Sequence, residues 1–120
     1  MGASHRSGAV LVVEDDFLIA IDSKAVLAEL GFHDVYIAHN IVNGRALLSS
    51  IHLELGLLDI NIGSELVYPL AAELSVRHIP IVFLTGGAQS GVPHEWRSHP
   101  ILSKPLTKRL LRNALASLGF

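Results

Sequence analysis

The stretch VLVVEDDFLIA, residues 10–20, decides the fold class of this chain. Its first four residues are apolar and three of them are β-branched, which is typical of a short strand buried on both faces of a parallel sheet. Three acids follow at once, Glu14, Asp15 and Asp16. Because adjacent like charges repel, these acids indicate a site at the end of the strand that takes a positively charged ligand.

The rest of the chain alternates apolar runs with helical patterns. We predict strands at residues 9–13, 34–38, 55–60, 79–85 and 100–103, and helices at residues 16–30, 41–51, 63–76 and 106–118. Residues 86–99 carry three glycines and one proline, so any helix there is expected to be short and mobile. Strands that alternate with helices imply one parallel sheet with helices on both faces, and right-handed crossovers leave few topologies for it.

Local signals set expectations for two of these helices. Asp16 stands at the start of the first helix and is expected to be its N-cap or a first-turn acid rather than a metal ligand. Apolar residues recur at helical spacing, which predicts that they form the packed face of this helix: Leu18, Ile21, Ala25 and Ala28. The third helix is expected to open at residues 63–64, which would place Pro69 just after its first turn, where it removes a backbone hydrogen bond and bends the helix.

Length and composition favour one packed domain. The chain has 120 residues, of which 50% are hydrophobic and 17% charged, so we expect a flexible tail at residues 1–8 and a single domain at residues 9–120. There is no cysteine, which excludes disulfides and thiolate metal sites. A net charge of −2 gives no general attraction to nucleic acid or anionic membranes. No apolar run approaches the ~20 residues of a membrane span and no signal peptide is evident, so we expect a cytoplasmic protein.

Polar side chains follow four of the five predicted strands. Glu14 and Asp15 follow the first, Asp59 ends the third, Thr85 ends the fourth, and Lys104 follows the fifth. Ligands of open parallel sheets bind outside the carboxyl ends of the strands. The sequence therefore predicts that these acids, a hydroxyl and an ammonium group meet at one edge of the sheet.

This constellation resembles the receiver domain of two-component response regulators, over nearly the whole chain. The resemblance implies a flavodoxin-like, doubly wound, five-stranded parallel sheet with strand order 2-1-3-4-5. It also implies that Glu14 and Asp15 help to bind Mg²⁺, that Asp59 accepts a phosphoryl group, that Thr85 is the switch hydroxyl, and that Lys104 is the lysine of the Lys-Pro pair. The implied phosphoryl donor is a sensor histidine kinase or a histidine phosphotransfer protein.

The chemistry of Mg²⁺ agrees with this assignment. The ion prefers oxygen ligands and retains several waters. Asp15, Asp59 and the backbone carbonyl of Asn61 would supply three oxygens, with Glu14 acting largely through water. Without the cation these carboxylates repel each other, and at least one of them is expected to titrate with a raised pKa.

Two features depart from the common receiver pattern. Ile101 stands where an aromatic switch residue is usual, and the loop after Asp59 is short. With the run Phe83-Leu84-Thr85-Gly86-Gly87, these departures resemble the single-domain subgroup nicknamed FAT GUY, although Leu84 replaces its alanine. We therefore expect phosphorylation to order residues 86–99 rather than to flip an aromatic ring. Trp96, in this segment, is interpreted either as a partner anchor or as a partly buried lid residue.

The sequence leads to one main functional hypothesis and two alternatives. The main one is a stand-alone receiver with no output domain, which signals by contact with another, unknown protein or acts as a phosphate shuttle or sink. It would not be an enzyme on external substrates. The first alternative is a small Mg²⁺-dependent phosphohydrolase with Asp59 as nucleophile, although Asn61 stands where such enzymes carry a second acid. The second is a receiver-like module that binds a partner without phosphorylation. The seven histidines show no metal-ligand spacing and are interpreted as scattered surface residues.

Overall fold

Five strands form one parallel sheet, and the computed structural model describes residues 8–87 and 91–120 of the chain. The strands are β1 (Ala9–Val13), β2 (Val35–Ala38), β3 (Leu53–Asp59), β6 (Ile81–Thr85) and β7 (Ile101–Ser103). Their order is β2-β1-β3-β6-β7, with every pair parallel. Since β6 and β7 are the fourth and fifth strands of the sheet, this confirms the predicted flavodoxin-like order 2-1-3-4-5. Residues 1–7, most of the predicted tail, lie outside the described residues.

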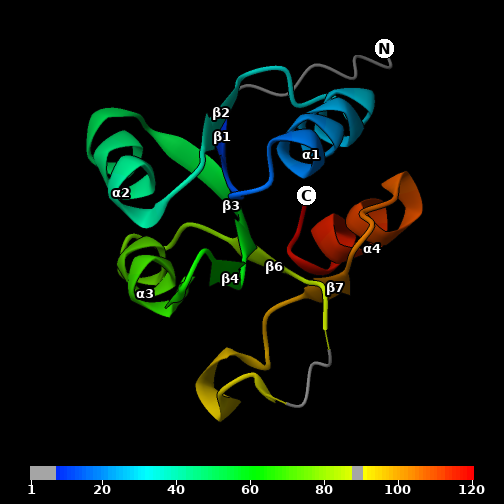
Figure 1. The fold of residues 1–120 in the computed structure, drawn as a ribbon. Coiled ribbons are helices and arrows are strands. Elements are labelled where there is room, and N and C mark those ends of the chain that lie inside the picture. Colours follow the sequence, from blue (N-terminus) through cyan, green and yellow to red (C-terminus); the bar gives the residue numbers. More distant parts are fainter. Residues whose placement is uncertain (1–7, 88–90) are drawn as a thin grey trace.

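Helices cover both faces of the sheet (Figure 1). Those on one face are α1 (Phe17–Glu29) and α4 (Lys108–Ser117), and those on the other are α2 (Ile41–Ser50) and α3 (Tyr68–Val76). Side chains alternate along each strand, so neighbouring residues enter different cores. Leu57 packs with residues of α1 and α4, whereas Leu58 packs with residues of α2 and α3. The central strands β1, β3 and β6 are therefore buried on both sides, as the opening apolar run predicts for β1, whereas the edge strands β2 and β7 are only partly buried.

The first helix begins as predicted but buries a different face. The Asp16 side chain accepts a hydrogen bond of 3.1 Å from the Ile19 amide, which makes it the N-cap. The prediction for Leu18 and Ile21 is wrong, because they are 71% and 44% exposed. The buried face consists of Ala20, Ser23 and Leu27. The helix carries apolar residues all round, so its period alone does not select the face that packs on the sheet.

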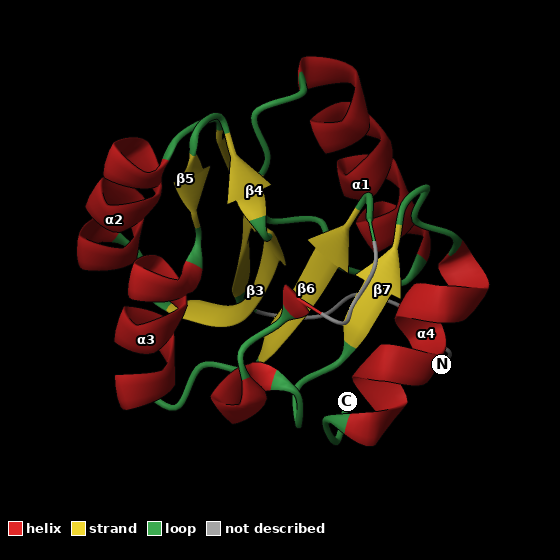
Figure 2. Ribbon diagram, turned by 60° about the horizontal axis from the view of Figure 1, so that its bottom comes forward, coloured by secondary structure: helices red, strands yellow, loops and turns green. Residues whose placement is uncertain are grey.

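A small hairpin replaces the predicted start of the third helix (Figure 2). Strands β4 (Asn61–Ile62) and β5 (Glu65–Leu66) pair in antiparallel fashion around a turn at Gly63, where φ is +62°. The helix begins only at Tyr68, so the prediction that it opens at residues 63–64 is wrong. Pro69 consequently lies in the first turn, where a backbone N–H has no partner within the helix and its loss costs nothing.

The segment after β6 contains little regular structure. Within residues 91–99 lies a short 3₁₀ helix, η2 (His94–Trp96). This agrees with the expected short helix, whereas residues 88–90 lie outside the description and the mobility of residues 86–99 stays a prediction. Trp96 stacks on Tyr68, with ring centroids 6.0 Å apart. It also makes a T-shaped contact with Phe83, with ring centroids 5.8 Å apart. No helix in the described part of the chain has the length and apolar character of a membrane span.

Candidate functional site: carboxylates and a lysine at the strand ends

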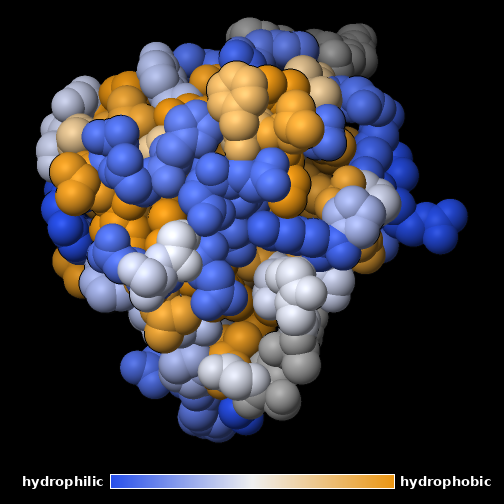
Figure 3. Space-filling model, in the orientation of Figure 1, coloured by the Kyte–Doolittle hydropathy of each residue, from blue (hydrophilic) through white to orange (hydrophobic). Residues whose placement is uncertain are grey.

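A cavity of about 580 Å³ lies at the carboxyl ends of the strands. Its lining comes from the ends of β1, β3, β6 and β7, the hairpin and α1: Glu14, Asp15, Asp16, Ile19, Asp59, Asn61, Gly63, Gly86, Gly87 and Lys104. The strand register explains why these distant segments meet, because β3 pairs with both β1 and β6, and β6 pairs with β7. Hydrophilic residues fill the middle of the face in Figure 3, where Figure 1 labels β3 and β6.

Three acids form an oxygen-only cluster in this cavity. Carboxylate oxygens of Glu14, Asp15 and Asp59 lie within 4.8 Å of one another. Glu14 and Asp59 are buried, with 0% and 3% of their surface exposed, while Asp15 is exposed. Carboxylates this close repel unless a cation or a proton lies between them. The donor set fits a hard divalent cation such as Mg²⁺, which prefers oxygen ligands.

Lys104 supplies the positive charge that the structure places beside the buried acids. Its Nζ donates a hydrogen bond of 2.8 Å to Asp59 Oδ2 and forms an ion pair with Glu14 Oε1 at 2.9 Å. From the described residues that Glu14 oxygen receives no hydrogen bond of good geometry, so it retains acceptor capacity. Burial alone would lower the pKa of Lys104, but the bonds to Asp59 and Glu14 outweigh burial and raise it above its usual value. The lysine is therefore charged at neutral pH.

The pKa values of two neighbouring acids of the cluster, Glu14 and Asp15, are shifted in opposite directions. Burial raises the pKa of Glu14 from 4.5 to about 7, against the opposing effect of a hydrogen bond from the Asp16 amide. The Gly63 amide donates a hydrogen bond of 2.9 Å to Asp15 Oδ2 and holds the pKa of Asp15 below its usual value. The raised pKa expected for one acid of the cluster thus belongs to Glu14.

The structure brings four of the predicted site side chains together and places the fifth to one side. Glu14, Asp15, Asp59 and Lys104 all line the cavity, and Asn61 does so as a residue of β4. Thr85 ends β6 at the same edge and is buried, but it is not among the described residues of the lining. Its Oγ1 instead accepts a hydrogen bond of 3.1 Å from the Gly87 amide.

Sequence reasoning missed the part of the site that the hairpin supplies. Gly63 contributes a backbone amide to Asp15, across 48 positions of sequence. A signal for it was present, because Gly63-Ser64 between Ile62 and Glu65 is also a typical two-residue hairpin turn. Ile19, which lines the cavity from the first turns of α1, carries no polar signal that a motif search would detect.

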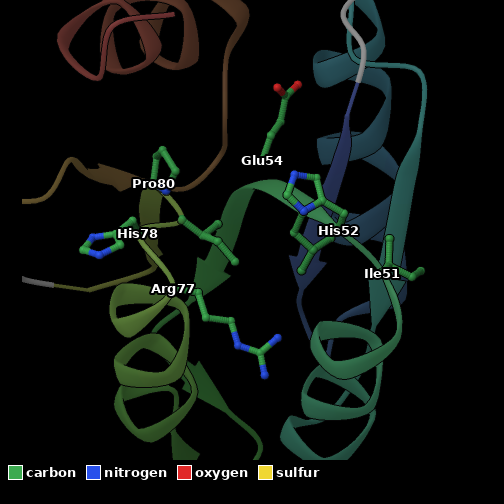
Figure 4. A pocket seen from close by; sticks show the side chains of 8 residues that line it. Ile51, His52, Glu54, Arg77, His78 and Pro80 are labelled. Carbon is green, nitrogen blue, oxygen red and sulfur yellow. The ribbon is translucent and has the colours of Figure 1, made fainter.

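A second cavity, of about 330 Å³, lies at the amino ends of β3 and β6 (Figure 4). His52, Glu54, Arg77 and His78 line it, but the Glu54 carboxylate points away from Arg77 and His52. Arg77 donates a hydrogen bond of 2.8 Å to the Leu48 carbonyl. The charged groups therefore do not converge, and among the described residues no histidine joins a cluster with metal-binding geometry.

No protein-family model matches the sequence, and a search of curated proteins found no match. Among solved structures, SdrG from Sphingomonas melonis Fr1 matches with a TM-score of 0.84 and 33% identity, over 94% of this chain and 97% of that chain. The response regulator receiver domain (CheY-like) from Methylobacillus flagellatus matches with a TM-score of 0.82 and 20% identity, over 94% and 99% of the two chains. This chain belongs to the CheY-like receiver domains.

The receiver domain is also similar to an activated structure. The BeF3-activated conformation of SdrG from Pseudomonas melonis Fr1 matches with a TM-score of 0.79 and 34% identity, over 92% of this chain and 94% of that chain. These matches establish the family of this receiver domain, while its place in the FAT GUY subgroup stays a prediction.

Proposed function

We propose that this receiver domain accepts a phosphoryl group on Asp59 from the phosphohistidine of a sensor histidine kinase or a histidine phosphotransfer protein. The observation that carries the proposal is the position of Asp59, which is buried, lines an open cavity and lies 2.8 Å from Lys104 Nζ. An acid without a role at this site would be expected to lie solvated on the surface, neither buried nor paired with a charged group as Asp59 is. A buried carboxylate with one paired oxygen is a nucleophile whose orientation is fixed before the substrate arrives.

The two oxygens of Asp59 have different surroundings. Oδ2 accepts the short hydrogen bond of 2.8 Å from Lys104, whereas Oδ1 accepts a long one of 3.4 Å from the Asn61 amide. Lone pairs of Oδ1 are therefore available for attack on phosphorus. A P–O bond to Asp59 forms as the P–N bond of phosphohistidine breaks, and the electron pair of that bond leaves with the imidazole. The Lys104 ammonium, already at the site, offsets the charge of the phosphoryl oxygens.

The acid cluster is the part of the site that fits Mg²⁺. Glu14, Asp15, Asp59 and the backbone carbonyl of Asn61 are the proposed ligands, with Glu14 acting largely through water. The fit rests on three carboxylate oxygens within 4.8 Å and on Glu14 Oε1, which has no hydrogen bond of good geometry. When bound, the ion neutralises charge on the carboxylates and on the transferring phosphoryl group.

Thr85 is the proposed link between phosphorylation and a change of surface. Its hydroxyl, now an acceptor from the Gly87 amide, would turn to donate to a phosphoryl oxygen. Phe83 lies two positions earlier on the same face of β6, where it contacts Trp96. A shift of β6 would therefore reach residues 91–99 directly. This route needs no aromatic side chain at position 101, where the chain has isoleucine.

The output proposed for the phosphorylated domain is contact with a downstream protein, or transfer of the phosphoryl group onward as a shuttle or sink. Its own chemistry would be limited to gaining and losing that group. A phosphohydrolase is disfavoured because Asn61, in place of a second acid, has no proton to give to a leaving group. Release of inorganic phosphate from small phosphate esters at many turnovers would favour that alternative.

The deciding experiment is incubation of the purified chain with acetyl phosphate and Mg²⁺, followed by intact-mass measurement. We expect a gain of one phosphoryl group that EDTA prevents and that Asp59→Asn abolishes. Asp22→Asn, a change of an exposed acid on α1 outside the cavity, is the matched control and is expected to react like the unmodified chain. Absence of any adduct would favour a module that binds its partner without phosphorylation.

A further inference from the structure

The β4–β5 hairpin, which is not part of the five-stranded sheet, donates a hydrogen bond to one acid of the cluster, Asp15. Its turn places the Gly63 amide 2.9 Å from Asp15 Oδ2. The turn is itself anchored, because Ile62 is 3% exposed and pairs with Glu65 across the hairpin. A hydrogen bond to a carboxylate is stronger than one between neutral groups. The hairpin thus fixes the direction of a side chain that belongs to a distant strand end.

Asp15 is the member of the cluster that needs such support. Glu14 and Asp59 are buried, and Lys104 pairs with both of them. Asp15 is exposed, and an exposed carboxylate without a partner samples several rotamers. Oδ2 accepts from the hairpin, which leaves Oδ1 as the oxygen that would coordinate the cation. A ligand that is already oriented loses less conformational freedom on binding, which strengthens binding.

We propose that Gly63 is a positioning residue for the divalent-cation site, whose amide directs the Asp15 carboxylate toward Glu14 and Asp59 before the cation binds. This inference rests on the proposed function, since it assigns a role toward the Mg²⁺ of that function. It adds the hairpin, a feature outside the strand-end constellation, to the machinery of the site.

The backbone conformation at position 63 explains why the residue is glycine. Its φ of +62° lies in the left-handed region, which residues with a β-carbon avoid. Space does not require glycine, because a β-carbon there would meet no atom of the described part of the chain within 4 Å. Side-chain size and backbone preference can therefore be separated. Asparagine tolerates the left-handed region, whereas the β-branched valine resists it strongly.

The experiment compares Gly63→Asn with Gly63→Val in the full chain and measures the Mg²⁺ dissociation constant by calorimetry. We expect Gly63→Val to weaken Mg²⁺ binding by about tenfold, since the backbone would leave the conformation that aims the amide. Gly63→Asn is expected to bind within about twofold of the unmodified chain. Gly119→Val is the matched control, because Gly119 also has a positive φ and open space around it but lies at the far end of the chain. It should leave Mg²⁺ affinity unchanged.

A second measurement does not depend on the stability of the valine variant. Amide hydrogen exchange of Gly63, without Mg²⁺, reports the hydrogen bond to Asp15 directly. We expect protection of this amide in the unmodified chain and its loss in Asp15→Ala, and unchanged exchange in Asp15→Ala would overturn the inference. Equal Mg²⁺ affinity of Gly63→Val and Gly63→Asn would also overturn it, while leaving the proposed function intact. Failure of the unmodified chain to bind Mg²⁺ would overturn both.

Discussion

Lys104 reaches across the end of β6 to place its Nζ 2.8 Å from Asp59 Oδ2 at the end of β3. The same nitrogen lies 2.9 Å from Glu14 Oε1 at the end of β1. The ammonium group of Lys104, which follows β7, therefore forms ion pairs with acids at the ends of β1 and β3, so that three of the five strand ends are linked. Because its partners are buried, these contacts bear on the stability of the fold as well as on phosphoryl transfer.

Replacement of Lys104 by methionine tests this relationship. Lys104→Met keeps the length of the side chain but leaves Asp59 and Glu14 without their cation, so we expect the free energy of unfolding to fall by about 1–3 kcal/mol. Urea denaturation without Mg²⁺ measures it. Lys108→Met is the matched control, since its exposed ion pair with Glu29 is 3.9 Å long, and we expect a change of at most about 0.5 kcal/mol. Equal effects of the two substitutions would contradict a special role for Lys104.

His99 makes the aromatic contacts of residues 91–99 sensitive to pH. Its ring lies 5.8 Å from that of Phe83 and 5.4 Å from that of Trp96, and burial lowers the pKa of His99 below its usual value of 6.5. The unfolded chain therefore binds the proton more readily than the folded chain. The contribution of neutral His99 to stability is complete above pH 6.5 and is lost as the pH falls through 6.5 toward the folded-state pKa.

The measurement is urea denaturation at pH 7.5 and 5.5, on the unmodified chain and on His99→Gln. We expect the unmodified chain to lose more stability between these pH values, because glutamine has no proton to gain in this range. His94→Gln, a change of an exposed histidine of the same segment, is expected to behave like the unmodified chain. A pH dependence identical in all three proteins would contradict the assignment to His99.

The sheet could be predicted from the sequence because the strands are mostly apolar and four of the five strand ends are followed or closed by polar groups. The two-residue strands β4 and β5 were missed, since so short a segment has no period and the only signal for them, the turn pair Gly63-Ser64, was interpreted as a helix start. The buried face of α1 was missed because Leu18 and Ile21 look as apolar as the residues that pack. The Thr85 hydroxyl lies beside the Gly87 amide because of the rotamer of its side chain, and no sequence pattern specifies that rotamer.

Trp96 provides a spectroscopic test of the route from Thr85 to residues 91–99. It is the only tryptophan of the chain and packs on Tyr68 and Phe83. Addition of Mg²⁺ and beryllofluoride, a phosphoryl mimic, is expected to shift its emission maximum, because movement of Thr85 alters the same face of β6 as Phe83. Asp59→Asn is the control and should show no shift. An emission spectrum that stays constant, in a chain whose Asp59 demonstrably binds the mimic, would contradict this route.

Gly87 is predicted to govern the lifetime of the phosphorylated state. It lines the cavity two positions after Thr85, and a β-carbon there would meet no atom of the described residues within 4 Å. A large side chain at this position can therefore enter the space from which water attacks the phosphoryl group. We expect Gly87→Tyr to slow loss of the phosphoryl group from Asp59 several-fold, as followed by intact mass after removal of acetyl phosphate. Gly91→Tyr, in the same segment but outside the cavity lining, is expected to leave the rate unchanged. Equal rates for Gly87→Tyr and the unmodified chain would show that water reaches the site by a path that does not pass Gly87.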